Sequence, residues 1–308
     1  MLQVTQLTKA YGPIQAVDGI SLSIDRGACY ALLGPNGAGK TTTINLLSGL
    51  LQPDSGQVSI NGFNPATDPL KVKASIGVIP QEIALYDELT ARQNLHFWAG
   101  LYGISPVEIR RRADAALERI GLKDRADQPL QTFSGGMKRR INIAAAILHK
   151  PAILFMDEPT VGIDPQSRNH IYELIQELHR EGMTILYTTH YMEEAEKLCD
   201  RIGIVDRGRL VAEGTLRQLR DRLPNQTRIH LETRGLTPEV GVQLQAQYGD
   251  RIAIGEEQVW LSPNLVHQDI AELVRSCGEL HVDIQHLEVK EADLEAVFLE
   301  LTGRALRD

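Results

Sequence analysis

The sequence predicts an α/β fold in which helices cover both faces of a mostly parallel sheet. Short β-rich runs alternate with helical patterns along most of the chain, as they do in successive βαβ units. One such run, Ile153-Leu154-Phe155-Met156, is continuously apolar, which is typical of a strand buried on both faces. Candidate parallel strands of this kind span residues 29–33, 153–157, 184–188 and 202–205.

Further elements surround this predicted sheet. Residues 2–8 and 16–24 resemble two strands joined by Tyr11-Gly12-Pro13, which predicts an antiparallel β subdomain at the start of the chain. Residues 166–180 carry the apolar stripe of an amphipathic helix. A mostly helical stretch predicts a helical insert, which we place at about 82–150, and we expect the whole first domain to span residues 1–222.

The pattern resets after Leu223-Pro224-Asn225, and we expect a second domain over residues 225–308. Its runs follow the order β, α, β, β, α, β and a last helix, which predicts a small ferredoxin-like α+β domain. The last helix keeps an apolar stripe, so it should dock rather than remain free. The runs span residues 228–233, 238–248, 252–261 with a turn at 255–257, 265–277, 280–289 and 292–301.

Composition excludes several functional classes. A chain of 308 residues suits two domains, and its net charge of -8 argues against nucleic acid as the main partner. No window approaches the ~18 apolar residues of a membrane span, and the start of the chain lacks the pattern of a secretion signal. We therefore expect a cytosolic protein. The three cysteines are scattered and are expected to be reduced, mostly buried thiols: Cys29, Cys199 and Cys277.

The first motif that carries chemistry fits the phosphate-binding loop G-x-x-x-x-G-K-[ST]. It follows a predicted strand and opens a predicted helix at 41–50, as a phosphate cradle requires; a glycine-rich turn without a ligand is the alternative. Lys40 should hold the β- and γ-phosphates, Thr41 should bind Mg²⁺, and Thr42 should add a phosphate contact. The motif comprises Gly34, Pro35, Asn36, Gly37, Ala38, Gly39, Lys40 and Thr41.

Charged side chains follow two of the predicted strands. Asp157 and Glu158 end the apolar run 153–156, so both carboxylates should emerge at the sheet edge where the phosphate-binding loop lies. His190 directly follows residues 184–189, at the same end of another strand. A solvated strand end is the alternative for the carboxylates. These positions predict a reaction centre beside the bound phosphates.

A second segment, Ser134-Gly135-Gly136, precedes the helix-like run 139–148. A hydroxyl and two glycines before a helix can present free N–H groups and a positive dipole end to a phosphate. The chain therefore carries two separate phosphate-binding ends. The basic runs Lys138-Arg139-Arg140 and Arg110-Arg111-Arg112 are expected to be solvated helix faces, and contact with anionic lipid headgroups or a membrane partner is the alternative.

Together, the two phosphate-binding segments resemble those of the ATP-binding subunits of ABC transporters. The resemblance covers residues 1–222 and implies a P-loop NTPase core of the ABC ATPase type. In that family, the loop of one subunit and the Ser-Gly-Gly segment of another hold the same ATP. The chain departs from the commonest family pattern in three places: Phe133 and Ile163 stand where leucine is usual, and Met137-Lys138 replaces the frequent glutamine after the glycines.

The resemblance also implies roles for individual residues. Asp157 would support Mg²⁺, Glu158 would act as the general base, and His190 would contact the γ-phosphate. Gln81, which follows Ile76-Gly77-Val78-Ile79-Pro80, would reach the metal and the attacking water; a surface glutamine is its alternative. Tyr11 would stack on adenine, unless it is a core or turn residue, and Asp164 would reach across a dimer.

These roles imply a motor subunit that hydrolyses ATP with Mg²⁺. Two copies, expected to be identical, would close around ATP and drive a separate integral membrane permease at the cytoplasmic face of the membrane. The end of the chain, from Asp293 to Gly303, looks like that of exporter subunits. A soluble ABC ATPase acting on ribosomes or DNA and a non-hydrolysing ATP-gated scaffold are the alternatives, although the latter should lack Glu158 or His190.

Overall fold

The computed structural model describes residues 1–222, 227–255, 257–264, 266–291 and 294–302. Contacts within the chain form two compact units, one of residues 1–216 and one that begins at Arg217. The predicted linker at 223–225 lies outside the described residues, and the domain limits remain predictions. In the described ranges, no helix is both long enough and apolar enough to cross a bilayer.

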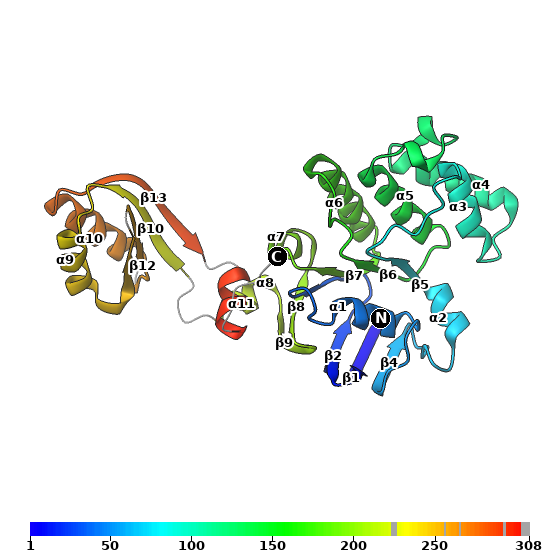
Figure 1. The fold of residues 1–308 in the computed structure, drawn as a ribbon, viewed down its shortest axis with the longest axis horizontal. Helices are drawn as coiled ribbons and strands as arrows, with labels where there is room; N and C mark the ends of the chain where they lie inside the picture. The colour runs from blue at the N-terminus through cyan, green and yellow to red at the C-terminus, as the bar shows by residue number, and fades with distance from the viewer. Residues whose placement is uncertain (223–226, 256, 265, 292–293, 303–308) are drawn as a thin grey trace. The chain divides into compact units, whose positions relative to one another are not determined.

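A six-stranded sheet forms the centre of the first unit (Figure 1). Its order is β5-β6-β7-β3-β8-β9. Among the described strands of this sheet, only β9 runs antiparallel to its neighbour. The four predicted parallel strands are confirmed as the adjacent strands β6, β7, β3 and β8. The strands are β3 Cys29–Leu33, β5 Ile76–Ile79, β6 Ile153–Asp157, β7 Thr184–Thr189, β8 Arg201–Asp206 and β9 Arg209–Gly214.

Both faces of this sheet are buried. Side chains alternate along each strand, so neighbouring residues pack into different cores on the two faces. In β6, Ile153 and Phe155 pack into a core shared with α1 and the antiparallel strands. Leu154 and Met156 pack into a second core with α5 and α6. The run 153–156 is continuously apolar because, as predicted, this strand is buried on both faces. The helices next to the sheet are α1 Lys40–Leu47, α6 Pro165–Arg180 and α7 Met192–Leu198.

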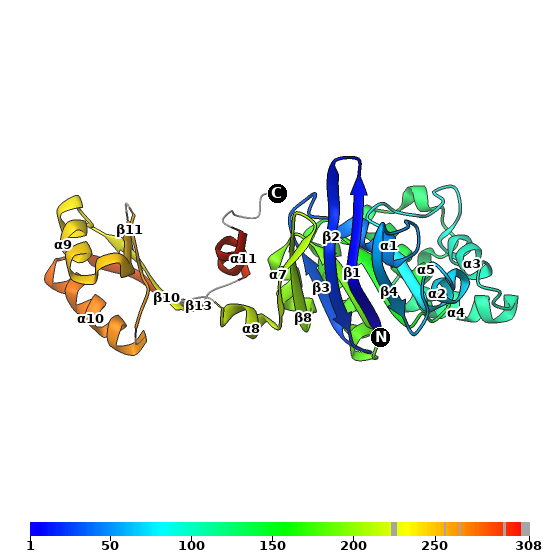
Figure 2. The same ribbon diagram turned by 90° about the horizontal axis from the view of Figure 1, so that it is seen from below.

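A three-stranded antiparallel sheet of order β2-β1-β4 carries the start of the chain, and Figure 2 shows its strands side by side. The sequence predicted its first two strands, whereas the third was missed. The pairing of Leu2 with Ile24 on one side and Ile60 on the other places apolar side chains over α1. The strands are β1 Leu2–Tyr11, β2 Ile14–Ile24 and β4 Ser55–Ile60.

Helices α3, α4 and α5 lie together, with α5 packed on the sheet, and form the predicted helical region (Figure 1). Thr90 and Gln93 form a capping box at the start of α3, which fixes where this helix begins. Helix α5 begins at Gly135 and not at residue 139 as predicted, because Ser134 caps it. The helices are α2 Pro69–Ser75, α3 Ala91–Gly100, α4 Pro106–Arg119 and α5 Gly135–Ile147.

The second unit contains an antiparallel sheet of order β11-β12-β10-β13, and the chain order βαββαβ confirms the ferredoxin-like prediction. Leu244 and Leu273 pack α9 and α10 against it. Leu294 and Phe298 of α11 are buried, as a docked last helix requires. Predicted positions 256, 265, 292 and 293 lie outside the described residues. The elements are α8 Leu216–Arg220, β10 Thr227–Arg234, α9 Pro238–Tyr248, β11 Ile252–Ile254, β12 Gln258–Leu261, α10 Val266–Glu279, β13 Asp283–Glu291 and α11 Leu294–Thr302.

Candidate nucleotide-binding site

The loop of residues 34–39 connects β3 to α1 and needs glycine at two positions. A Cβ at Gly34 would lie 2.2 Å from the Val205 carbonyl oxygen, and one at Gly39 would lie 2.2 Å from that of Ala16. Gly39 also has a φ of 100°, which side-chain-bearing residues rarely adopt. No side chain caps the start of α1, so its first N–H groups remain available for an anion.

Lys40 is the first residue of α1 and is only 4% exposed. Its Nζ donates hydrogen bonds to the carbonyl oxygens of Gly34 at 2.7 Å and Pro35 at 2.9 Å. The same nitrogen forms an ion pair with Glu158 Oε1 at 2.9 Å. A buried ammonium requires such partners, and the loop therefore wraps around its own cation.

The two carboxylates lie at the end of β6, as predicted. Asp157 accepts a hydrogen bond from Thr188 Oγ1 at 2.7 Å. Glu158 adopts a left-handed φ of 44°, and its N–H donates to the Thr188 hydroxyl at 3.0 Å. This conformation is costly for a residue with a side chain. The bonds to β7 hold it, and it turns the Glu158 carboxylate toward Lys40.

Two more predicted residues converge on the other oxygen of Glu158. Gln81 Nε2 donates to Glu158 Oε2 at 3.4 Å, and His190 Nδ1 lies 3.3 Å from the same atom. Lys40, Gln81 and His190 thus surround the carboxylate of Glu158, although the four residues come from four separate segments of the chain. Glu158 is the centre of this cluster.

The remaining residues of the loop region differ in exposure. Thr41 is exposed and Thr42 is half-buried, whereas Thr43 is buried and donates to the Gly39 carbonyl at 2.9 Å. Tyr11 lies at the end of β1 and is 46% exposed, which excludes a core role. The backbone of Ala16, in the paired strand β2, lies against the loop at Gly39.

The second segment predicted to bind phosphate lies at an exposed helix end. Ser134 Oγ accepts a hydrogen bond from Met137 N at 3.3 Å, and both Ser134 and Gly135 are exposed. Gly136 is buried against α6, where an added Cβ would lie 2.2 Å from Ser167 Cβ. Asp164 caps α6 by accepting from Ser167 N at 2.9 Å, and this hydrogen bond lowers the pKa of its exposed carboxyl.

The structure does not bring these residues to the loop at 34–42 of the same chain. No hydrogen bond or ion pair between described residues joins Ser134, Gly135 or Asp164 to that loop. A separation of this kind is required if the segment serves a neighbouring molecule.

The prediction of a solvated face at 138–140 is wrong for Arg139. Its side chain is 3% exposed and donates to the carbonyl oxygens of Pro80, at 2.6 Å, and Gln81. Burial lowers the pKa of this guanidinium. Arg139 thus ties α5 to the segment that carries Gln81. Its spacing from the buried Gly136 and Ile143 places all three on one face of α5, a signal that the charged run concealed.

Lys138 and Arg140 are also bound rather than freely solvated. Lys138 pairs with Asp87 at 2.7 Å, and Arg140 donates to the Ile120 carbonyl at 2.7 Å. In the other basic run, Arg112 forms a bond of 2.7 Å to the Leu148 carbonyl, so that run is only partly a solvated face. Both runs stabilise the helical region.

These features define a P-loop ATPase site. A family model described as "ABC transporter" matches residues 17–161. The chain is 47% identical to the linearmycin resistance ATP-binding protein LnrL of Bacillus subtilis (strain 168), over 100% of both chains. It is 38% identical to the daunorubicin/doxorubicin resistance ATP-binding protein DrrA of Streptomyces peucetius, over 100% of this chain and 94% of that protein.

A solved dimeric structure of a bacterial ABC transporter cassette matches with a TM-score of 0.64 and 28% identity, over 70% of this chain and 99% of that one. The chain belongs to the ABC transporter family as an ATP-binding subunit. Its activity is the hydrolysis of ATP, and the names of these relatives give no support to an action on ribosomes or DNA.

Proposed function

We propose that this chain is the ATP-driven motor of an exporter and that two identical copies bind ATP head to tail. Each triphosphate lies between the 34–42 loop of one copy and the Ser134 end of α5 in the other. The separation of these two ends in one chain carries the proposal. The exposure of Ser134 and Gly135 supports it, because an anion-binding helix end without a buried partner is free to receive one.

The residues present fit Mg²⁺ together with a triphosphate. Among the described residues, no group of three or more His, Cys, Asp or Glu side chains could hold a metal alone. The Thr41 hydroxyl and the Asp157 carboxylate are the hard oxygen ligands that Mg²⁺ takes alongside phosphates and water, with Gln81 nearby. When bound, the ion would neutralise negative charge on the phosphate oxygens.

The cluster around Glu158 supplies the groups for hydrolysis. In this proposal, Glu158 takes the proton of the attacking water, while Gln81 and His190 orient that water and the γ-phosphate. Lys40 exchanges the carboxylate and loop carbonyls for phosphate oxygens when ATP binds. Closure follows because both copies contact the γ-phosphate, so ATP and ADP differ in affinity for the closed pair.

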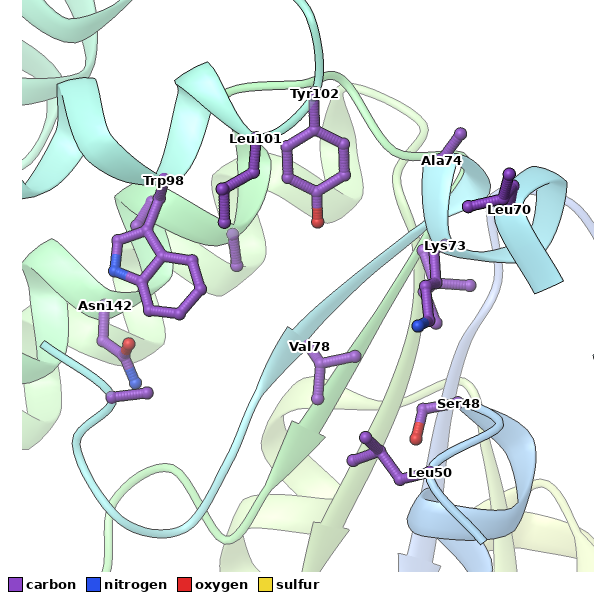
Figure 3. Close-up of a pocket in the computed structure, with 14 residues that line it drawn as sticks. Ser48, Leu50, Leu70, Lys73, Ala74, Val78, Trp98, Leu101, Tyr102 and Asn142 are labelled. Carbon is purple, nitrogen blue, oxygen red and sulfur yellow. The ribbon is translucent and has the colours of Figure 1, made fainter. Parts of the chain in front are cut away.

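A groove between α2 and α3 is the proposed docking surface for the permease. Figure 3 shows Trp98 and Leu101 on one side of this groove, and Leu50 and Leu70 on the opposite side. Leu70 is 80% exposed. Exposed groups of large apolar side chains are uncommon on protein surfaces and mark sites of interaction with a partner. Ala84, in the segment that follows Gln81, also lines the groove. A cytoplasmic segment of the permease would therefore sense the nucleotide through Gln81.

The direction of transport is proposed from the relatives. LnrL and DrrA are both named as resistance ATP-binding proteins, and both match over the full length of this chain. An export motor of this kind acts at the cytoplasmic face of the membrane, where ATP is available.

The dimer is tested with the Glu158→Gln variant. This change keeps the shape of the side chain but removes the base, so ATP should bind and remain uncleaved. Size-exclusion chromatography with saturating Mg²⁺-ATP should show a dimer, and ADP should leave a monomer. The same variant with Lys40→Ala is the control, which should stay monomeric. A monomer of Glu158→Gln at saturating ATP would reject the shared site.

A further inference from the structure

A buried carboxylate outside the ATP site gathers four hydroxyl groups. Glu194 of α7 is 1% exposed, and its two oxygens accept from donors on three other segments. The donors are Thr160 Oγ1 and Tyr172 OH (2.8 Å) to Oε1, and Tyr187 OH (2.9 Å) and Thr189 Oγ1 (2.6 Å) to Oε2. A buried carboxylate is tolerated only when it is hydrogen-bonded in this way.

The hydroxyls around Glu194 remain protonated donors. Burial and the nearby Glu194 charge raise the pKa of Tyr187 well above its ordinary value, and the same two causes raise that of Tyr172. Each hydroxyl therefore points its hydrogen at the carboxylate. Glu194 consequently fixes the direction of four hydroxyl groups at once.

One of these hydroxyls controls the backbone beside His190. Thr189 Oγ1 donates to Glu194 and at the same time accepts from the N–H of Tyr191 at 2.9 Å. The residues before and after His190 are thereby bound to each other. Because the hydroxyl hydrogen is directed to Glu194, its lone pairs are available to the Tyr191 N–H.

A second hydroxyl reaches the segment that follows Glu158. Thr160 lies two positions after Glu158 in the sequence, and its side chain is bound to Glu194. Its carbonyl accepts from Ile163 N at 3.2 Å, just before Asp164. Glu194 thus joins the backbone that follows the proposed base to the backbone that carries the histidine.

We propose that Glu194 is a positioning residue for hydrolysis, which holds the His190 and Glu158 segments at the separation that lets His190 reach Glu158. The inference rests on the proposed roles of Glu158 and His190. Glu194 itself touches no reacting atom. A glutamine in its place has one NH₂ group where two hydroxyls now donate. Those two hydroxyls must rotate away, and the His190 and Glu158 segments are no longer held in the same relative position.

The first experiment measures steady-state ATP hydrolysis and nucleotide affinity of the full chain with Glu194→Gln. We expect kcat to fall by about 10- to 100-fold, as for small misplacements of reacting groups. KM and the affinity for a fluorescent ATP analogue should stay within about twofold, because Glu194 is not part of the binding loop. An unchanged kcat overturns the inference.

A matched pair of variants on β7 separates positioning from stability. Thr184 Oγ1 accepts from Gly27 N at 2.9 Å, just as Thr189 accepts from Tyr191 N at 2.9 Å, but at the opposite end of the strand. Thr184→Val and Thr189→Val should lower Tm alike. Only Thr189→Val should lower kcat. The variant Thr189→Ser keeps the hydroxyl and should therefore have the kcat of the wild type. An equal loss of kcat in both valine variants makes Glu194 a merely structural residue and overturns the inference.

A double variant distinguishes this inference from the proposed function. If Glu194 acts through His190, adding Glu194→Gln to His190→Ala should cause no further loss of kcat. A further multiplicative loss overturns the inference and leaves the function intact. A wild-type rate in His190→Ala alone overturns the role of His190 and, with it, the inference.

Discussion

The two helix ends that we propose to bind phosphate differ in how many partners each has within its own chain. The 34–42 loop is folded around Lys40, which has three oxygen partners within its own chain. The Ser134 end is exposed, and among the residues that the structure describes, its hydroxyl only caps α5. In the proposed function, Lys40 at the first end would exchange its partners for phosphate oxygens, whereas the second end would serve the nucleotide of a neighbouring copy.

This difference teaches that similar glycine patterns serve different purposes. Gly34 and Gly39 allow close backbone contacts that shape a loop, and a side chain there would strike a carbonyl oxygen. Gly136 instead lets two helices touch, because a side chain there would strike Ser167. Gly135, where an added Cβ would meet only Ile163 Cδ1 at 3.7 Å, has the space that an approaching ligand needs, and so does Gly37 in the loop, where no atom lies within 4 Å. Variants at the two ends should therefore fail in different ways.

The largest effect is expected for Lys40→Ala. It removes the only cation placed inside the loop among the described residues, so ATP affinity should fall by about 100-fold or more. Isothermal titration with ATP measures this loss. A dissociation constant within about threefold of wild type would contradict the loop assignment.

Ser134→Ala is the matched variant at the other end. A single copy should bind ATP as before, while hydrolysis should fall by about 10²-fold, because the partner's phosphate loses a donor. Mixing the two variants sharpens the comparison. A mixed pair retains one site with both Lys40 and Ser134, so activity should exceed that of either variant alone. If mixing restores nothing, the sites are not shared.

An intermediate effect is expected for Gly136→Ala. The new Cβ would lie 2.2 Å from Ser167 Cβ, so the helices must separate, at a cost of about 1–3 kcal/mol. Urea unfolding measures this loss, and Ser167→Gly in the same chain should restore most of it. Gly135→Ala is the control, since its nearest atom is 3.7 Å away and its stability should hardly change. Equal destabilisation by both alanines would contradict the packing described here.

The smallest effect is expected for Asp164→Asn. The cap to Ser167 lowers the pKa of this carboxyl below its ordinary 3.8, so its charge stabilises the folded state. That contribution is complete above the unfolded pKa and disappears as the pH falls through the lower folded value. Thermal unfolding should therefore show a small deficit at neutral pH that vanishes in strong acid. A deficit that grows with acidity would contradict the sign.

Much of this site could be predicted because the carboxyl ends of parallel strands share one sheet edge. Asp157, Glu158 and His190 each follow an apolar strand, and the P-loop does the same, so their convergence followed from topology. The ferredoxin-like order followed in the same way from the sequence of runs. Strand β4 was missed, because Ser55–Ile60 is short and contains few apolar residues.

Tertiary partners could not be predicted. Arg139 is buried because two carbonyl oxygens of a distant segment receive its guanidinium, and nothing near it in the sequence reveals them. The same holds for Glu194, whose four donors lie 5 to 34 residues away. Charged residues are assigned to the surface by default, and only the packed structure identifies the exceptions.

The ion pair between Lys40 and Glu158 affects the state of the carboxylate in a molecule without nucleotide. While it persists, the group that would activate water is neutralised by the cation that the substrate requires. In the proposed cycle, an incoming triphosphate would take the place of Glu158 at Lys40, and this exchange would free the carboxylate. Under the proposed roles, the carboxylate would become free to accept a proton only in a molecule that already holds its substrate.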